Sequence, residues 1–154
     1  MHNPLLALTL TLATTATALG QAKVVNNCDF AVSVWSVGSA VSSPHRLSAH
    51  GGSYGETFSR DPQTGGRALK VTVPADGLWT GAPQADFAYN LDGAQVWYDL
   101  SDVFGDPFAG HKVVVASADA SCPAIVWGNG TPPAGSQVKV CTADQSVTFT
   151  LCAA

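Results

Sequence analysis

The feature that most constrains this chain is a series of short segments in which apolar and polar residues alternate. Alternation with a period of two is typical of a β-strand that buries one face, and Gly, Pro, Ser and Asp separate the segments as turn residues do. No segment has a helical period. The segments cover residues 22–26, 30–37, 53–58, 67–73, 86–91, 94–100, 111–117, 136–140 and 146–151. The chain is therefore predicted to form an all-β fold, an antiparallel β-sandwich, with irregular loops over residues 38–53, 79–84 and 122–137.

Length and charge limit the possible partners. The chain has 154 residues, of which 46% are hydrophobic and 12% are charged, which fits one compact domain with a substantial core. The formal net charge of −4 argues against nucleic acid, because phosphate binding needs a basic stripe that seven scattered Lys and Arg residues cannot make. No internal repeat or linker is present. We expect a monomer that binds neither nucleic acid nor membrane.

The N-terminus carries an uncharged apolar stretch from Leu5 to Gly20 that ends in small residues. Its apolar part is too short to span a bilayer and is typical of a secretory signal peptide. We expect residues 1–20 to be a signal peptide cleaved before Gln21, leaving a single domain over residues 21–154. The protein is thus predicted to be secreted, either extracellular or associated with a cell wall.

Four cysteines in a secreted chain of this size predict two disulfides, with three possible pairings. A bond between Cys28 and Cys152 would tie the two ends of the domain together, because one follows the first strand and the other ends the last. Cys122 and Cys141 would then close the Pro/Gly-rich loop between them. The spacing fits neither a zinc ribbon nor a redox-active motif, so we expect no metal and no cofactor.

Asp92-Gly93 predicts a β-hairpin with a two-residue type I′ turn, since both central residues of that turn need a positive φ. With this loop, Asp86 lies directly opposite Asp99. The face predicted to be apolar carries Phe87, Tyr89, Leu91, Val96, Tyr98 and Leu100. The other face carries Asp86, Asn90, Gln95, Trp97 and Asp99.

Two carboxylates placed opposite each other are destabilising, so their presence calls for an explanation. A shared proton, a bound cation or a nearby basic group would each provide one. Alternatively, the strands splay at this end, or both groups simply face water. Glycoside hydrolysis is a further possibility, because Asp86 and Asp99 could meet the separation of about 5 to 5.5 Å used by retaining enzymes. Asp102 or Asp106 could supply the wider separation of an inverting enzyme.

Sugar binding without cleavage needs less than hydrolysis. Trp97 offers an aromatic face for stacking, and Asn90 and Gln95 offer amides beside the carboxylates. Packing across the sheet is the structural alternative for Trp97. The loop after residue 122 also contains Asn129-Gly130-Thr131, a sequon for N-glycosylation.

Three segments resemble thaumatin-like proteins in order, spacing and character. They are VVNNCDFAVSVWSVGS, GGRALKV and PQADFAYNLDGAQVWYDLSDVFGDPF. From about Ala22 to Cys152 the chain is similar, more closely, to the small fungal secreted family named after the blastomyces yeast-phase-specific protein. The resemblance implies a flattened β-sandwich in which the first and last cysteines are bonded, which corresponds to Cys28 and Cys152.

The resemblance to thaumatin-like proteins also implies an acidic cleft that is built in larger relatives from one arginine and four carboxylates and is linked to β-1,3-glucan binding or weak hydrolysis. Asp86 and Asp99 match two of the cleft carboxylates. Phe104 stands where the next is expected, with Asp102 and Asp106 on either side. Lys70 lies one residue before the position expected for the arginine.

These observations support three functional hypotheses. The first is a protein that binds cell-wall or host polysaccharide of the β-glucan type without turnover. The second is a weak β-1,3-glucanase that uses Asp86 and Asp99 as catalytic residues. The third is a secreted effector or interaction protein, whose acidic face would complement a basic host protein. In all three, Asn90, Gln95, Trp97, Asp102, Asp106 and Lys70 are the candidate ligand-binding residues.

Overall fold

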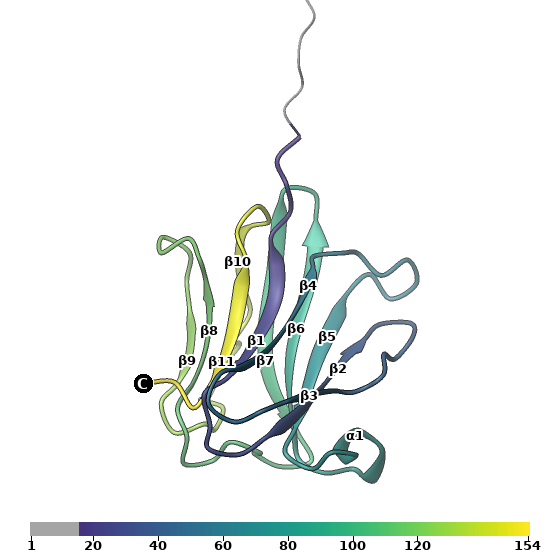
Figure 1. Cartoon of the computed structure of the whole chain (residues 1–154). Coiled ribbons are helices and arrows are strands. Elements are labelled where there is room, and N and C mark those ends of the chain that lie inside the picture. The colour runs from purple at the N-terminus through teal and green to yellow at the C-terminus, as the bar shows by residue number, and fades with distance from the viewer. Residues whose placement is uncertain (1–15) are drawn as a thin grey trace, which may run out of the picture.

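A computed structural model describes residues 16–154 of the chain and contains two β-sheets packed face to face (Figure 1). The five-stranded sheet has the order β4 (Gly52–Thr57), β1 (Gln21–Asn26), β11 (Val147–Leu151), β8 (Val113–Ser117) and β9 (Ile125–Trp127). The six-stranded sheet has the order β10 (Lys139–Thr142), β7 (Gln95–Val103), β6 (Gln84–Asp92), β5 (Arg67–Thr72), β2 (Val32–Val37) and β3 (His45–Leu47). The predicted all-β sandwich is confirmed.

Three short elements lie within or beside the loops that we expected to be irregular. They are β3, β9 and the single-turn helix α1 (Gly77–Thr80). Each has only three or four residues, too few for a period of two or 3.6 to be recognised. The last predicted segment before the C-terminal strand also differs, because β10 begins at Lys139 and extends to Thr142.

The core lies between the sheets and is formed by the alternating apolar residues of the strands. Phe87 on β6 is fully buried and contacts Phe149 on β11, with ring centroids 6.1 Å apart. Tyr89, Tyr98 and Leu100 are also buried on the inner face of the hairpin. The face predicted to be apolar is thus the face that packs against the second sheet.

One strand pair departs from the expected antiparallel arrangement. β1 and β11 pair in parallel and lie side by side in the five-stranded sheet (Figure 1). Because parallel strands end at the same edge of a sheet, the residues that follow them meet there. Cys28 and Cys152 are bonded at this edge, with Cα atoms 5.0 Å apart.

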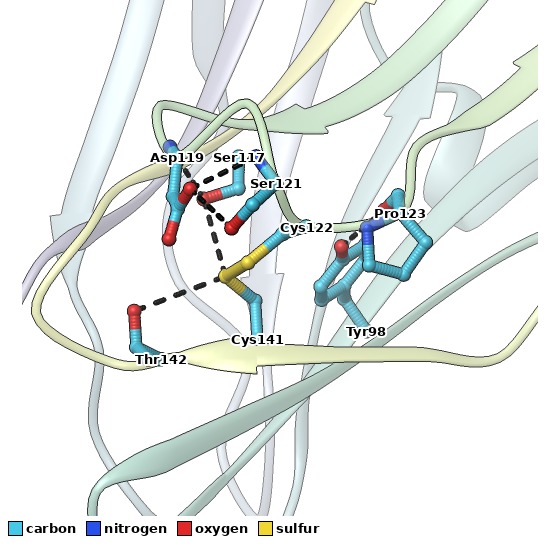
Figure 2. The surroundings of a disulfide bond; sticks show 8 residues. All are labelled: Tyr98, Ser117, Asp119, Ser121, Cys122, Pro123, Cys141 and Thr142. Atoms are coloured by element: carbon cyan, nitrogen blue, oxygen red, sulfur yellow. Dashed lines mark hydrogen bonds between the residues drawn. A yellow bond between two sulfur atoms is a disulfide. The ribbon is translucent and has the colours of Figure 1, made fainter.

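The second disulfide connects the two sheets at one side of the sandwich. It joins Cys122, in the loop before β9, to Cys141 on β10 (Figure 2). The hydroxyl of Tyr98 donates a hydrogen bond to the carbonyl of Pro123 beside it. Asp119 lies close to both sulfurs, but their bond removes the thiolates that a metal ion would need. Both predicted disulfides are confirmed, and this one fixes β10 against the loop of the opposite sheet.

The folded region includes Gly20. Its N–H donates to the carbonyl of Ala143 at 2.8 Å, and its own carbonyl accepts from Phe58 at 3.0 Å. Residues 1–15 of the predicted signal peptide lie outside the described part of the chain. Cleavage after Gly20 stays a prediction. Within residues 16–154, no helix is long and apolar enough to cross a bilayer.

Candidate functional site

The β6–β7 hairpin forms as predicted, but its register differs by two residues. Asp92 pairs with Gln95, so the turn consists of Gly93 and Ala94. Gly93 has φ of 57° and Ala94 has no positive φ, as in a type II′ turn with glycine at its first central position. The expected pairing of Asp86 with Asp99 is therefore wrong, because Asp86 lies opposite Ser101 and Asp99 lies opposite Ala88.

A shift of two residues leaves every side chain on its predicted face, because the side-chain period of a strand is two. Asp86 and Asp99 therefore still share the outer face of the six-stranded sheet. They are now diagonal neighbours, about 7 to 8 Å apart along the sheet, rather than directly opposed. This spacing removes the geometry that suggested a retaining glycosidase.

Asp86 is paired with a basic group on its other side. β5 places Lys70 directly beside it, and Nζ of Lys70 lies 2.8 Å from Oδ2 of Asp86. Asp86 is only 8% exposed, and its burial raises the pKa of the carboxyl, while the ammonium of Lys70 opposes that rise. Lys70 thus supplies the nearby basic group that was one of the explanations considered for an acidic residue here.

A groove runs across the outer face of the six-stranded sheet, next to this ion pair. It has a volume of about 470 Å³, and Ala68 and Ala88 are among its lining residues. Trp97, Asp99 and Asn90 line it as well, and Trp97 is 42% exposed. We call this cavity the Trp97 groove. Its volume falls within the range of small-molecule sites, and three of the candidate ligand-binding and catalytic residues meet in it.

The rim of the Trp97 groove opposite Trp97 is held by a buried carboxylate. Asp61 accepts hydrogen bonds from the backbone N–H of Ser39 at 2.9 Å and of Thr64 at 2.8 Å. These and a third backbone donor, Gln63, hold the pKa of Asp61 well below its usual range. Thr64 lines the groove, and so does Gly38, which precedes Ser39 in the chain. Through its hydrogen bonds to Thr64 and Ser39, Asp61 therefore positions this side of the cavity.

The remaining candidates lie outside the Trp97 groove. Gln95 is exposed next to the turn, and Asp86 and Lys70 occupy the adjacent row of the sheet. Asp106 is exposed in the loop after β7. Asn129 is also exposed, and its carbonyl accepts a hydrogen bond from Gly110.

Asp102 lies at the end of β7 in an unusual setting for a carboxyl group. Both of its side-chain oxygens are buried, and they accept no hydrogen bond within the described part of the chain. Burial raises the pKa of Asp102 to about 7. The carboxylate of Asp106 also raises the pKa of Asp102, because it can accept a hydrogen bond only from the protonated form. The negative charge of Asp86 raises this pKa further. Asp102 thus titrates near neutrality.

This shift predicts how stability depends on pH. The folded state holds the proton of Asp102 up to about pH 7, whereas the unfolded chain releases it near 3.8, so stability falls as pH rises through this window. Asp102→Asn cannot ionise. It is expected to leave Tm unchanged near pH 4 and to raise it by about 2–4 °C near pH 8, which corresponds to about 1 kcal/mol because the residue as a whole is only partly buried.

Thermal unfolding followed by circular dichroism at both pH values measures this effect. Asp144→Asn, at an exposed turn between β10 and β11, is the matched control and should shift Tm little at either pH. Equal shifts for Asp102→Asn at both pH values would contradict the titration and leave only a packing effect.

Several groove residues were not predicted from the sequence. Arg67 lines the Trp97 groove at the start of β5, and Val37 and Val138 line it from β2 and from the loop before β10. The only sequence signal for this part of the groove was the pair Gly65-Gly66, which precedes Arg67. Paired glycines allow a ligand or another segment to approach the backbone closely. The valines have no distinguishing pattern, since their exposure depends on how the strands are ordered in the sheet.

A two-disulfide β-sandwich whose six-stranded sheet carries a groove lined by Trp97, Asp99 and Arg67 has the features expected of a small thaumatin-like protein. The chain matches the Blastomyces yeast-phase-specific protein family over residues 9–153 and belongs to that family. The resemblance of its sequence to fungal thaumatin-like proteins is thereby confirmed.

Known relatives agree with this assignment. The chain is 31% identical to the antigenic thaumatin-like protein of Arthroderma benhamiae over 73% of its length, but it spans only about half (55%) of that relative. It is 26% identical to the secreted thaumatin-like protein calA of Emericella nidulans, over 98% of this chain and 97% of calA. The crystal structure of the protein elicitor MoHrip2 from Magnaporthe oryzae is similar, with a TM-score of 0.72 and 28% identity, and the match covers 87% of this chain and 99% of MoHrip2.

Proposed function

We propose that this secreted thaumatin-like protein binds cell-wall or host polysaccharide, of the β-glucan type, in the Trp97 groove without cleaving it. The observation that carries the proposal is the combination of a partly exposed indole and a carboxylate in one open groove. Trp97 and Asp99 both line it, and Ala68 and Ala88 lie between its two sides on neighbouring strands. This is the arrangement that a sugar ring requires.

A sugar ring has an apolar face and a rim of hydroxyl groups, so its site needs both kinds of contact. The ring of Trp97 offers a flat apolar surface, and the small side chains of Ala68 and Ala88 allow a ligand to approach the sheet. The carboxylate of Asp99 and the amide of Asn90 can accept and donate hydrogen bonds at the rim. Arg67 adds a fixed positive charge that also donates.

The same geometry favours binding over hydrolysis. Glycosidases place two carboxyl groups on either side of the scissile bond. In the described part of the chain, Asp99 is the only carboxylate that lines the Trp97 groove, and the nearby Asp86 is bound by Lys70. A groove with one carboxylate can orient a sugar but lacks the second acid or base.

The binding proposal predicts a clear difference between two exposed tryptophans. Trp97→Ala is expected to weaken binding to insoluble β-1,3-glucan about tenfold, since the loss of stacking and apolar contact corresponds to about 1.4 kcal/mol. Depletion of the protein from solution by β-1,3-glucan, chitin and cellulose measures the affinity. Trp79→Ala is the matched control, because Trp79 is 69% exposed on α1 but does not line the groove.

If Trp97→Ala and Trp79→Ala bind every polymer as the wild type does, the groove is not the binding site. If the wild type is depleted by none of the polymers, polysaccharide binding itself fails. Asp99→Asn measures how much the negative charge of Asp99 contributes to polysaccharide binding. This substitution should weaken binding less than Trp97→Ala does.

Weak glucanase activity is a second candidate function, and Asp102 is the observation that favours it. Asp99 and Asp102 both line a smaller hollow beside the Trp97 groove. With its pKa raised to about 7, Asp102 can carry the proton of a general acid, and Asp99 can act as the base or nucleophile. Release of reducing sugar that is abolished by Asp102→Asn and by Asp99→Asn would support this function over simple binding.

A host protein partner is a third candidate. Trp79 and Phe104 are both 69% exposed, and Phe104 has φ of 61°, which is uncommon for a bulky residue. The segment that follows α1 meets the loop of Phe104 where Gly105 lies against Pro83. MoHrip2, with a similar structure, is described as a protein elicitor. These exposed aromatic side chains, with Asp76 and Asp106 nearby in the chain, would suit a basic protein surface.

A further inference from the structure

A second cavity adjoins the Trp97 groove along β7. It has a volume of about 290 Å³ and is lined by Ser101 and Asp102 of β7 on one side and by Pro132, Pro133 and Gln137 on the other. We call it the Pro132 hollow. Asp99 lines both cavities, so they meet at this residue. A ligand in the Trp97 groove that extends past Asp99 would reach the Pro132 hollow.

The Pro132 hollow exists because β7 is longer than its neighbour β10. β10 pairs only with Gln95–Tyr98, so the second half of β7 has no strand on that side. Two prolines stand there instead, and proline has no N–H with which to continue a sheet. The N–H of Leu100 donates to Oδ1 of its neighbour Asp99 at 2.9 Å. This donor is thus already used, which disfavours the addition of a peptide strand and leaves the edge open for another kind of ligand.

The far wall of the Pro132 hollow is held in place. Its residues lie between Cys122 and Cys141, so the disulfide closes the segment that contains them. The amide of Gln137 accepts a hydrogen bond from Nε1 of Trp127 at 3.2 Å and donates to the carbonyl of Gly135 at 3.2 Å. A wall fixed by the disulfide and by the hydrogen bonds of Gln137 is already ordered before a ligand binds, which favours affinity.

We infer that the ligand of this face is a linear polysaccharide that occupies both cavities, with Asp99 between them. This inference rests on the proposed polysaccharide binding and adds the size of the ligand. Trp97 and Ser101, which share the outer face, are four residues apart on β7, which corresponds to about 13 Å at about 3.3 Å per residue. Because that distance exceeds the length of a disaccharide, the site selects a chain of several sugar units over short fragments.

The dependence of affinity on chain length tests the inference. Isothermal titration calorimetry is performed with disaccharides and hexasaccharides of the laminari, cello and chito series. In the series that binds, the hexasaccharide is expected to bind at least about tenfold more tightly than the disaccharide, a difference of about 1.4 kcal/mol. Ser101→Arg fills the Pro132 hollow from an exposed position on β7 and should reduce the affinity for the hexasaccharide to that for the disaccharide.

Thr57→Arg is the matched control, because Thr57 is exposed on β4 of the other sheet and lines neither cavity. It should leave both affinities unchanged. Equal affinity for the two lengths in the wild type, or equal weakening of both by Ser101→Arg, would overturn the two-cavity ligand while leaving binding in the Trp97 groove intact. If no oligosaccharide of any length binds, the proposed function fails first and this inference fails with it.

Discussion

Replacing Cys28 and Cys152 together by alanine is expected to lower the free energy of unfolding by about 5 kcal/mol. The bond closes a loop with a sequence separation of 124 residues, and the entropy that a disulfide removes from the unfolded chain grows with the logarithm of loop length. Such a loss is comparable with the whole stability of many domains of this size. Urea unfolding followed by tryptophan fluorescence measures the change.

Replacing Cys122 and Cys141 by alanine is the internal comparison. Their sequence separation is 19 residues, so the same relation gives a smaller loss of about 3 kcal/mol. Both double variants avoid an unpaired thiol. A larger loss for the short loop than for the long one would contradict the explanation by chain entropy. It would show that native contacts around Cys141, such as the one with Ser117, dominate.

Lys70→Met is expected to destabilise the protein by about 3 kcal/mol near neutral pH, because it leaves the buried carboxylate of Asp86 without its counter-charge. The effect should shrink as pH falls. Burial already raises the pKa of Asp86, and removing Lys70 removes the influence that opposes this rise. The folded variant therefore holds the proton more strongly than the unfolded chain, so its stability increases toward acidic pH.

The double variant Lys70→Met/Asp86→Leu separates the charge from the packing. It removes both ionic groups and is expected to recover most of the lost stability at neutral pH. Lys139→Met is the control for loss of a lysine, since Lys139 forms no ion pair within residues 16–154. Urea unfolding at acidic and neutral pH measures all four proteins. A loss for Lys70→Met that is the same at both pH values would show that Asp86 does not carry the effect.

The fold could be predicted from the sequence because most of its strands are long enough to show alternation. The strands from Gln84–Asp92 and Gln95–Val103 were recognised, together with the correct inner and outer faces. Their register was wrong because Asp92-Gly93-Ala94 allows two turns. Gly93 can provide a positive φ as the second residue of a type I′ turn or as the first of a type II′ turn, and the dipeptide does not distinguish them.

The partner of Asp86 could not be predicted from the hairpin alone. Lys70 belongs to β5, and only the order of strands in the sheet brings it beside Asp86. Lys70 was a candidate only because it lies one residue before the position of the arginine in thaumatin-like proteins, and its contact with Asp86 was not predicted. The Trp97 groove was missed for the same reason, since Val37 and Ala68 reach it from strands whose neighbours are not encoded locally.

The parallel pairing of β1 with β11 has a consequence for biosynthesis. β11 lies between β1 and β8, so this sheet cannot close until β11 has been made. Cys28 is the first cysteine to emerge, and Cys122 and Cys141 emerge before its native partner Cys152. During secretion, Cys28 must either stay reduced until the end or leave a wrong bond by thiol–disulfide exchange. Correct maturation of this small domain therefore requires an oxidising compartment in which thiol–disulfide exchange can occur.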